Sequence, residues 1–118
     1  MRGLTLVVAG SDQTRFRTAL GLAAAAAALD QRVRLFLDAP AVALVVSEGM
    51  PPVALPPPGQ PDTGELLETC LALGVGIILC QTGVADAGMT MAALDERFEA
   101  GGMTSLLGSL DEDRLLLV

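Results

Sequence analysis

Residues 4–38, LTLVVAGSDQTRFRTALGLAAAAAALDQRVRLFLD, hold the pattern that decides the fold. They begin with a continuous apolar run at 4–9 that includes β-branched side chains, which is typical of a strand buried on both faces of a parallel sheet. An alanine-rich segment follows, and Asp12 or Thr14 is placed to cap a helix there. A second apolar run at 33–37 lies between acidic residues. The order strand, helix, strand predicts a β-α-β unit whose alanines let the helix lie close to the sheet.

The rest of the chain continues this alternation. We expect an apolar but short segment at 41–46, a helix at 62–73 ended by Gly74, a strand at 75–80, a short helix from Thr82 through Met89, a brief strand at 95–99, a helix at 103–110 and a closing strand at 114–118. A proline-rich stretch at about 47–61 is expected to be an extended or mobile loop. The sequence therefore predicts one α/β domain over residues 1–118. Its architecture would be a three-layer α/β/α sandwich with a mainly parallel five-stranded sheet.

The composition argues against several classes of protein. Seven arginines, no lysine and fourteen acidic residues give a net charge of −7, which repels phosphate backbones and anionic lipid, so we expect no nucleic-acid partner. The longest nearly uninterrupted apolar run, residues 19–29, is shorter than the roughly 20 residues that a membrane-spanning helix requires, so we expect no membrane span. Histidine, lysine and tyrosine are absent. A histidine-based triad, a P-loop lysine and a lysine Schiff base are therefore excluded.

Two cysteines are too few for a secreted disulfide framework, and no Cys-x-x-Cys or Cys/His cluster predicts a metal or cofactor. We therefore expect a cytoplasmic protein. Cys70 falls on a helical stripe that should face the sheet, together with Leu66, Leu67, Leu71 and Leu73. Rises of about 1.5 and 3.3 Å per residue in helix and strand separate Cys70 from Cys80 by roughly 10 Å along the elements. Bridged cysteines need Cα atoms within about 7 Å, so we expect no disulfide between the two.

Cys80 is the main candidate for chemistry, because in open α/β sheets reactive groups gather beyond the carboxyl ends of the strands. A helix is expected to start just after it, and unpaired N–H groups at a helix start favour a thiolate. The alternative is that Cys80 is a small apolar residue that closes a strand. The same rim of the sheet contains the further candidates Ser11, Asp12, Gln81, Thr82 and Gly83.

The turn Gly10-Ser11-Asp12 matches neither GxGxxG nor GxxxxGK[ST], so a structural turn is the better interpretation. Two other hypotheses stay open. One is a non-catalytic oligomeric binding module that holds a small anion or nucleotide near Ser11, Asp12 and Arg15, with Cys80 structural. The other is a thiol redox sensor that forms an intermolecular Cys80 disulfide.

Three stretches resemble the DsrE/DsrF-like family. Residues 10–38 resemble its opening strand, first helix and second strand. ELLETCLALGVGIILCQTGVADAGM at 65–89 resembles its segment with a cysteine in a helix and another at a strand end, and FEAGGMTSLLGSLDEDRLLLV at 98–118 resembles its closing helix and strand. The resemblance implies that Cys80 corresponds to the cysteine that carries a persulfide in sulfur-relay members. It also implies a homo-oligomer, a trimer or hexamer, and a sulfur-acceptor protein as partner.

One departure from the family pattern concerns the residues after the key cysteine. Gly83 stands where several relatives carry Ser or Cys, which can change the surroundings of the thiol. The leading hypothesis is a sulfur-carrier or sulfurtransferase-like protein that accepts sulfane sulfur on Cys80 and passes it to a protein thiol.

Overall fold

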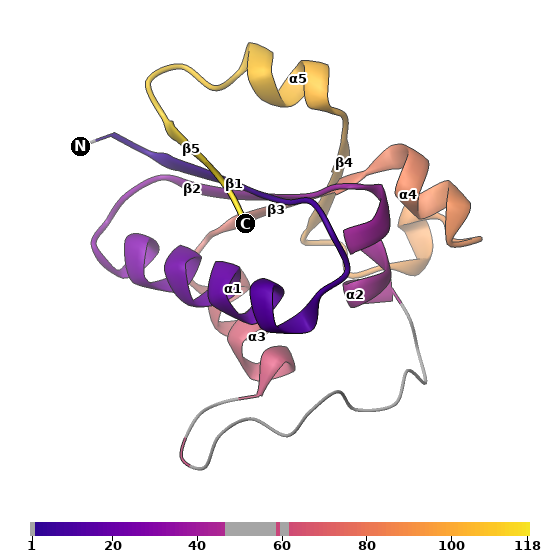
Figure 1. The fold of residues 1–118 in the computed structure, drawn as a ribbon, viewed down its shortest axis with the longest axis horizontal. Helices are drawn as coiled ribbons and strands as arrows, with labels where there is room; N and C mark the ends of the chain where they lie inside the picture. The colour runs from indigo at the N-terminus through magenta and orange to yellow at the C-terminus, as the bar shows by residue number, and fades with distance from the viewer. Residues whose placement is uncertain (1, 47–58, 60–61) are drawn as a thin grey trace.

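The fold is built on a single parallel sheet (Figure 1). The computed structural model describes residues 2–46, 59 and 62–118, so the expected loop at about 47–61 lies almost wholly outside the described residues. The sheet has the order β4-β3-β2-β1-β5 and all its neighbouring strands run parallel. Its strands are β1 (Leu4–Val8), β2 (Val33–Leu37), β3 (Gly76–Cys80), β4 (Phe98–Gly101) and β5 (Arg114–Leu117). The prediction of a five-stranded parallel sheet is confirmed.

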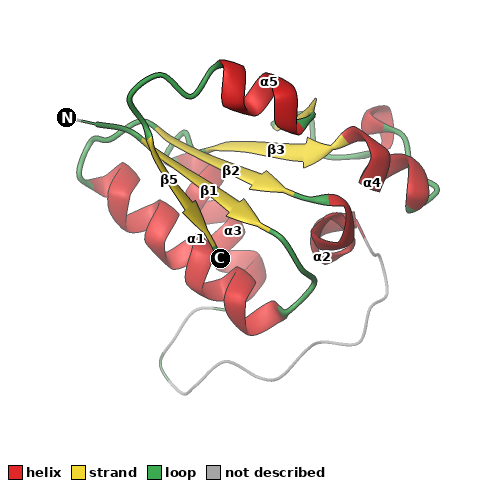
Figure 2. Ribbon diagram, turned by 45° about the horizontal axis from the view of Figure 1, so that its top comes forward, coloured by secondary structure: helices red, strands yellow, loops and turns green. Residues whose placement is uncertain are grey.

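Helices lie on both faces of this sheet (Figure 2). Helices α1 (Gln13–Ala28) and α3 (Thr63–Ala72) cover one face, and α5 (Met103–Gly108) lies over the other. The carboxyl end of β2 leads into the 3₁₀ turn η1 (Ala39–Val42) and helix α2 (Ala43–Val46), and β3 leads directly into α4 (Gln81–Asp86). A second 3₁₀ turn, η2 (Met91–Ala93), precedes β4. This arrangement gives the three expected layers.

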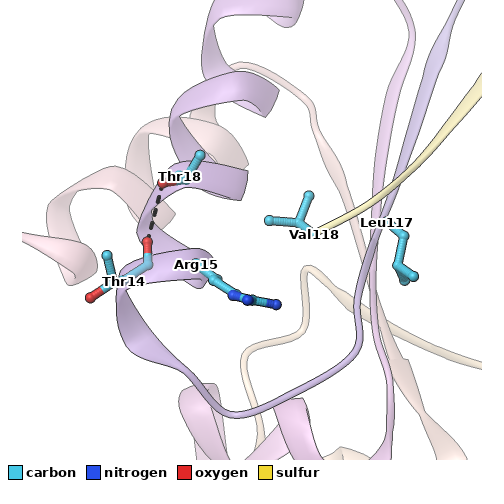
Figure 3. Close-up of a pocket in the computed structure, with 5 residues that line it drawn as sticks. All are labelled: Thr14, Arg15, Thr18, Leu117 and Val118. Atoms are coloured by element: carbon cyan, nitrogen blue, oxygen red, sulfur yellow. Dashed lines mark hydrogen bonds between the residues drawn. The ribbon is translucent and has the colours of Figure 1, made fainter.

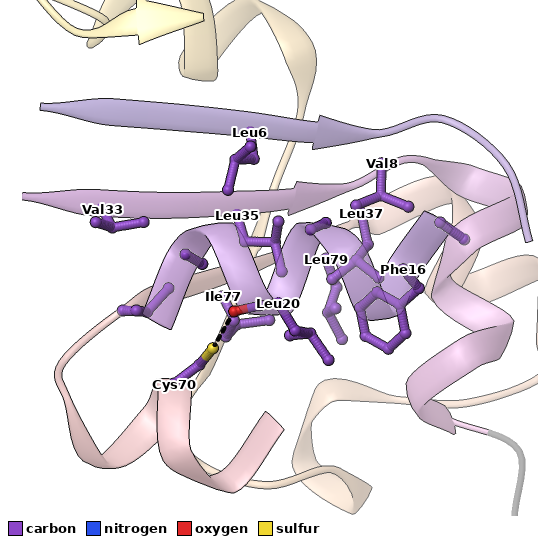
Figure 4. Packing of buried hydrophobic residues seen from close by; sticks show 14 of the residues in the cluster. Leu6, Val8, Phe16, Leu20, Val33, Leu35, Leu37, Cys70, Ile77 and Leu79 are labelled. Atoms are coloured by element: carbon purple, nitrogen blue, oxygen red, sulfur yellow. Dashed lines mark hydrogen bonds between the residues drawn. The ribbon is translucent and has the colours of Figure 1, made fainter. Parts of the chain in front are cut away.

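The main core lies between the sheet and the pair α1 and α3 (Figure 4). Leu6 pairs in register with Leu35, and Leu35 pairs with Ile77, so three fully buried side chains form a row across the strands. Ala19 and Ala23 of α1 are also fully buried. Their small side chains let the helix approach the sheet closely, as the alanine-rich sequence predicted.

Polar caps set the ends of both long helices. The Asp12 carboxylate accepts a hydrogen bond from the Arg15 N–H at 2.9 Å and begins α1. Asp62 and Glu65 form a reciprocal capping box at the start of α3. Gly74 follows α3 with φ at +84°, a left-handed conformation that glycine adopts without strain. These ends agree with the expected ones to within two residues.

A polar cluster stands between α5 and the sheet. The fully buried Thr5 hydroxyl donates to Asp113 Oδ2 at 3.0 Å, and Arg34 Nε donates to the Thr5 hydroxyl oxygen at 3.3 Å. Arg34 Nη1 also donates to Ser109 Oγ at 2.7 Å, just beyond the end of α5. The Asp113 side chain is only 6% exposed and lies within ion-pair distance of Arg34. Hydrogen bonds therefore hold the chain around α5 onto strands β1 and β2.

Residues 39–46, for which the sequence predicts neither helix nor strand, are helical: η1 has Pro40 in its first turn and continues into α2. Two other predictions were wrong. Leu73 is 46% exposed, since it is the C-cap of α3 and lies beyond the buried stripe that includes Cys70. Thr82 does not cap α4: the N-cap is Cys80, two residues earlier, and the helix ends at Asp86.

The fourth strand lies about three residues later than expected. Its predicted start, Asp95, instead belongs to an exposed cluster in which Arg97 binds both Asp95 and Glu68 at 2.8 Å. Residues 96 and 97 form a turn before Phe98, and the ion pair with Glu68 joins this turn to α3. The pKa of Asp95 is lowered to about 2, first of all by its hydrogen bond from the Arg97 side chain.

Candidate functional site

Cys80 lies where β3 ends and α4 begins. It is the last residue of the strand and the N-cap of the helix, with φ −60° and ψ 122°. Its side chain makes no capping hydrogen bond and is half-buried. Cys80 is therefore partly exposed at the carboxyl edge of the sheet, where it also packs against the core.

The face on which Cys80 lies follows from strand register. Arg34 pairs with Gly76, and side chains alternate along a strand, so Gly76, Ile78 and Cys80 share the face that Arg34 occupies. That is the face covered by α5 and not the one covered by α1 and α3. Cys80 thus lies outside the row of buried side chains that forms the main core.

Gly101 lies directly beside Cys80. The two residues pair in the parallel register of β3 with β4, and paired residues project from the same face. Glycine has no side chain, so the β4 residue paired with Cys80 adds none beside it. A Cβ at Gly101 would lie 2.8 Å from Ile78 Cγ2, which shows how closely the neighbouring side chain already approaches this glycine.

Gly83 fixes the short helix that follows the thiol. A Cβ at Gly83 would lie 2.7 Å from Val42 Cγ2 and 2.8 Å from the Ala39 Cα, distances that real Cβ atoms do not show. Helix α4 therefore rests directly on η1 through a buried glycine. Gln81 and Thr82, between Cys80 and this contact, are exposed. The glycine that departs from the family pattern is thus required by the packing of α4 in this chain.

The second cysteine has the opposite environment. Cys70 is fully buried under α1, and its thiol donates a hydrogen bond to the Leu20 carbonyl oxygen at 3.3 Å (Figure 4). Burial raises the pKa of the Cys70 thiol to about 11. Both cysteines are free, and Cys70 belongs to the core as its helical spacing predicted.

Ser11 and Asp12 are exposed in the turn after β1, and Asp12 is engaged as the cap of α1. Strand β2 lies between β1 and β3, so two strand spacings, about 10 Å, separate that turn from Cys80. The rim candidates therefore fall into two groups: Ser11 and Asp12 after β1, and Gln81, Thr82 and Gly83 after Cys80.

A shallow groove of about 280 Å³ lies still further from Cys80, between the first turns of α1 and the end of β5 (Figure 3). It is lined by Thr14, Arg15, Thr18, Leu117 and Val118. In Figure 3 the Arg15 side chain extends from the helix toward the end of the chain at Val118. Arg15 belongs to the candidate site for a small anion or nucleotide, but the lining of the groove includes neither Ser11 nor Asp12, the other two residues of that site.

Within the described residues, no group of three or more Cys, Asp or Glu side chains could hold a metal ion. None of the helices in the described part of the chain is long and apolar enough to cross a bilayer.

Comparison with known proteins agrees with the fold and with the ordering of its elements. The model of the DsrE/DsrF-like family matches residues 3–118. This chain belongs to the DsrE/DsrF-like family. Membership associates it with sulfur relay in general terms.

Among solved structures, this DsrE/DsrF-like chain is similar to the ychN protein from E. coli, with a TM-score of 0.72. The two are 23% identical, and the match covers 100% of each chain. At that level of identity the likeness concerns the fold. No curated protein sequence gives a significant match.

Proposed function

We propose that this DsrE/DsrF-like protein is a cytoplasmic sulfur carrier, or sulfurtransferase-like protein, in which Cys80 accepts sulfane sulfur and passes it to a partner thiol. The observation that carries the proposal is the contrast between the two cysteines. Cys80 is partly exposed at the carboxyl edge of the sheet, whereas Cys70 is fully buried and hydrogen-bonded. A nucleophilic thiolate must be reachable, and Cys80 alone of the two meets that condition.

The proposed transfer needs two thiolate attacks and no oxidant. In the first, the Cys80 thiolate attacks the outer sulfur of a donor persulfide, so the new Sγ–S bond forms as the donor S–S bond breaks. The donor leaves as a thiolate and takes up a proton. In the second, the thiolate of the acceptor protein attacks the outer sulfur of the Cys80 persulfide, and Cys80 leaves as a thiolate. The sulfane sulfur keeps its oxidation state throughout.

Two features of the surroundings support this role. Gly101, the β4 residue paired with Cys80, adds no side chain of its own beside the cysteine. The first-turn N–H groups of α4 follow Cys80 and have no partners within the helix, so they favour negative charge nearby. The chain has no histidine or lysine that could supply such stabilisation instead.

The proposal includes a homo-oligomer, either a trimer or a hexamer, and a separate sulfur-acceptor protein. Exposed leucines on α5 and β5 support self-association, because they leave apolar surface uncovered in one chain. The alternative, a binding module for a small anion or nucleotide near Ser11, Asp12 and Arg15, has less support. The groove beside Arg15 includes neither Ser11 nor Asp12 in its lining.

Intact mass after exposure to a persulfide donor tests the proposal. Wild-type protein should gain the mass of one sulfur atom, and reduction with a thiol should remove it. Cys80→Ser should gain nothing, whereas Cys70→Ala, the matched control, should gain as much as wild type. The proposal would be wrong if wild-type protein stayed unmodified, or if Cys80→Ser gained the same mass as wild type.

A further inference from the structure

Strand β5 forms an open edge of the sheet. It pairs with β1 on one side, and no described element lies on its other side (Figure 2). The Arg114 N–H donates to the Gly3 carbonyl at 2.9 Å and the Val118 N–H to the Val7 carbonyl at 2.8 Å. Backbone groups alternate in direction along a strand, so those of Leu115 and Leu117 point outward. This edge presents N–H and C=O groups ready for another strand.

The side chains on this edge are apolar and exposed. Leu115, Leu116 and Leu117 are 45%, 43% and 75% exposed. Isolated edges are usually protected by charges, prolines or bulges, and these three positions carry none of them. The opposite edge differs, because β4 carries the exposed Glu99 and is preceded by the Arg97 ion-pair cluster. Of the two edges, β5 is the one suited to pairing.

Unpaired charges of opposite sign stand at the two ends of β5. Glu112 precedes the strand, and its carboxylate has no hydrogen bond or ion pair to any described residue. Arg15 lies at the other end, in the groove beside Leu117 and Val118, and its guanidinium likewise has no partner among the described residues. Both charges are therefore available to a second molecule.

We propose that β5 pairs antiparallel with β5 of a second copy about a two-fold axis at Leu116, so that one sheet continues across two chains. In this register Leu115 lies opposite Leu117 of the partner subunit, and the outward backbone groups of each exchange hydrogen bonds. Leu116 meets Leu116 of the partner subunit on the opposite face. This register uses both outward-facing residues of the strand.

The antiparallel direction also matches the charges. It brings the start of β5 in one chain beside the end of β5 in the other, so Glu112 approaches the partner's Arg15 and the arrangement repeats on the other side of the two-fold axis. A self-complementary contact of this kind is what a two-fold dimer requires. Two chains of net charge −7 repel each other, and the paired opposite charges offset that repulsion at the contact.

Native mass by light scattering and sedimentation equilibrium tests the contact. Wild type should contain an even number of chains, either a dimer or a hexamer in which such contacts join two trimers. Leu116→Lys sets two like charges against each other at the axis and should halve the mass. Leu29→Lys is the control, because Leu29 is an equally apolar residue, 64% exposed, at the end of α1; it should leave the mass unchanged. A monomeric or trimeric wild type, or an unaltered mass for Leu116→Lys, overturns the proposal.

Charge reversal gives a second test that does not depend on how the strand tolerates lysine. Arg15→Glu and Glu112→Arg should each raise the dissociation constant of the two-fold contact by roughly tenfold or more, and the double variant should restore much of the affinity. A double variant no tighter than either single one overturns the predicted contact between these residues. Cys80→Ser should form assemblies of the same mass as wild type. The proposed contact between chains and the proposed sulfur transfer can therefore be tested independently.

Discussion

Cys80 and Gly101 lie side by side on adjacent parallel strands, and the glycine adds no side chain of its own beside the cysteine. Replacing Gly101 with alanine should slow the alkylation of Cys80 several-fold, because the new Cβ would lie 2.8 Å from Ile78 Cγ2 and force a shift of that side chain, which shares a face of β3 with Cys80. The measurement is the rate of iodoacetamide labelling, followed by intact mass. Gly102→Ala is the matched control, since a Cβ there has no atom within 4 Å. Equal labelling rates for both variants would show that the space beside Gly101 does not govern access.

Gly83→Ala should destabilise the protein by about 1–3 kcal/mol, because the added methyl group would press against the backbone of Ala39, which cannot easily move aside. The free energy of unfolding from urea titration measures the effect. Gly21→Ala, in open space within α1, should instead stabilise the fold by about 0.5–1 kcal/mol. A Gly83→Ala variant as stable as wild type would contradict the close contact between α4 and η1.

The raised pKa of the Cys70 thiol predicts that the folded protein loses stability at alkaline pH. Burial raises the pKa of this thiol in the folded protein to about 11 from the ordinary value of 9.0, so the unfolded chain releases this proton first. The stabilising contribution is fully present below pH 9 and is lost as the pH rises toward 11, with a slope of at most about 1.4 kcal/mol per pH unit.

Urea unfolding between pH 7 and pH 10.5 measures this slope, and Cys70→Ala should flatten it. The same curve for wild type and Cys70→Ala would assign the alkaline loss of stability to other groups. In the folded protein Cys70 should also resist alkylation under conditions in which Cys80 reacts.

Asp113→Ala should destabilise the protein by about 2 kcal/mol or more, because it leaves the buried Thr5 hydroxyl without its acceptor and Arg34 without its nearby carboxylate. Urea titration measures the stability, and amide hydrogen exchange should show faster opening around α5. Asp111→Asn is the control, since the Asp111 side chain is 78% exposed and lies 3.8 Å from Arg32, and asparagine tolerates the left-handed φ of +52° at this position. Similar losses in both variants would mean that the buried cluster adds nothing beyond a surface charge.

Much of the fold could be predicted from local patterns. The apolar runs of β1, β2 and β3 stand out because buried parallel strands need apolar side chains on both faces, and the alanines of α1 and the stripe through Cys70 mark buried helix faces. The position of β4 could not be found in the same way. The segment where the strand was expected to begin forms a turn instead, and its Arg97 binds Glu68, twenty-nine residues earlier in the chain, a contact that no local pattern contains.

The place of Cys80 at the end of a strand could be predicted from the sequence, but its surroundings could not. Cys80 could be singled out because it closes an apolar strand, whereas its relation to Gly101 depends on the β3–β4 register, which no local pattern contains. Gly83 could be recognised only as a departure from the family pattern, because its packing partners in η1 lie forty residues away in the chain. Likewise, the closing strand was expected, but its place at an edge depends on the strand order.

Because Cys80 is still part of β3, between β2 and β4, its sulfur is attached to a strand that is hydrogen-bonded on both sides and not to a loop. A carrier whose reactive cysteine lies on a long loop can move the bound sulfur from donor to acceptor. Here the bound sulfur would stay in one place, and the donor and acceptor proteins would have to move to it. In the proposed relay, donor and acceptor must each bring a protruding cysteine to the same fixed point, one after the other, so they would compete for a single docking position.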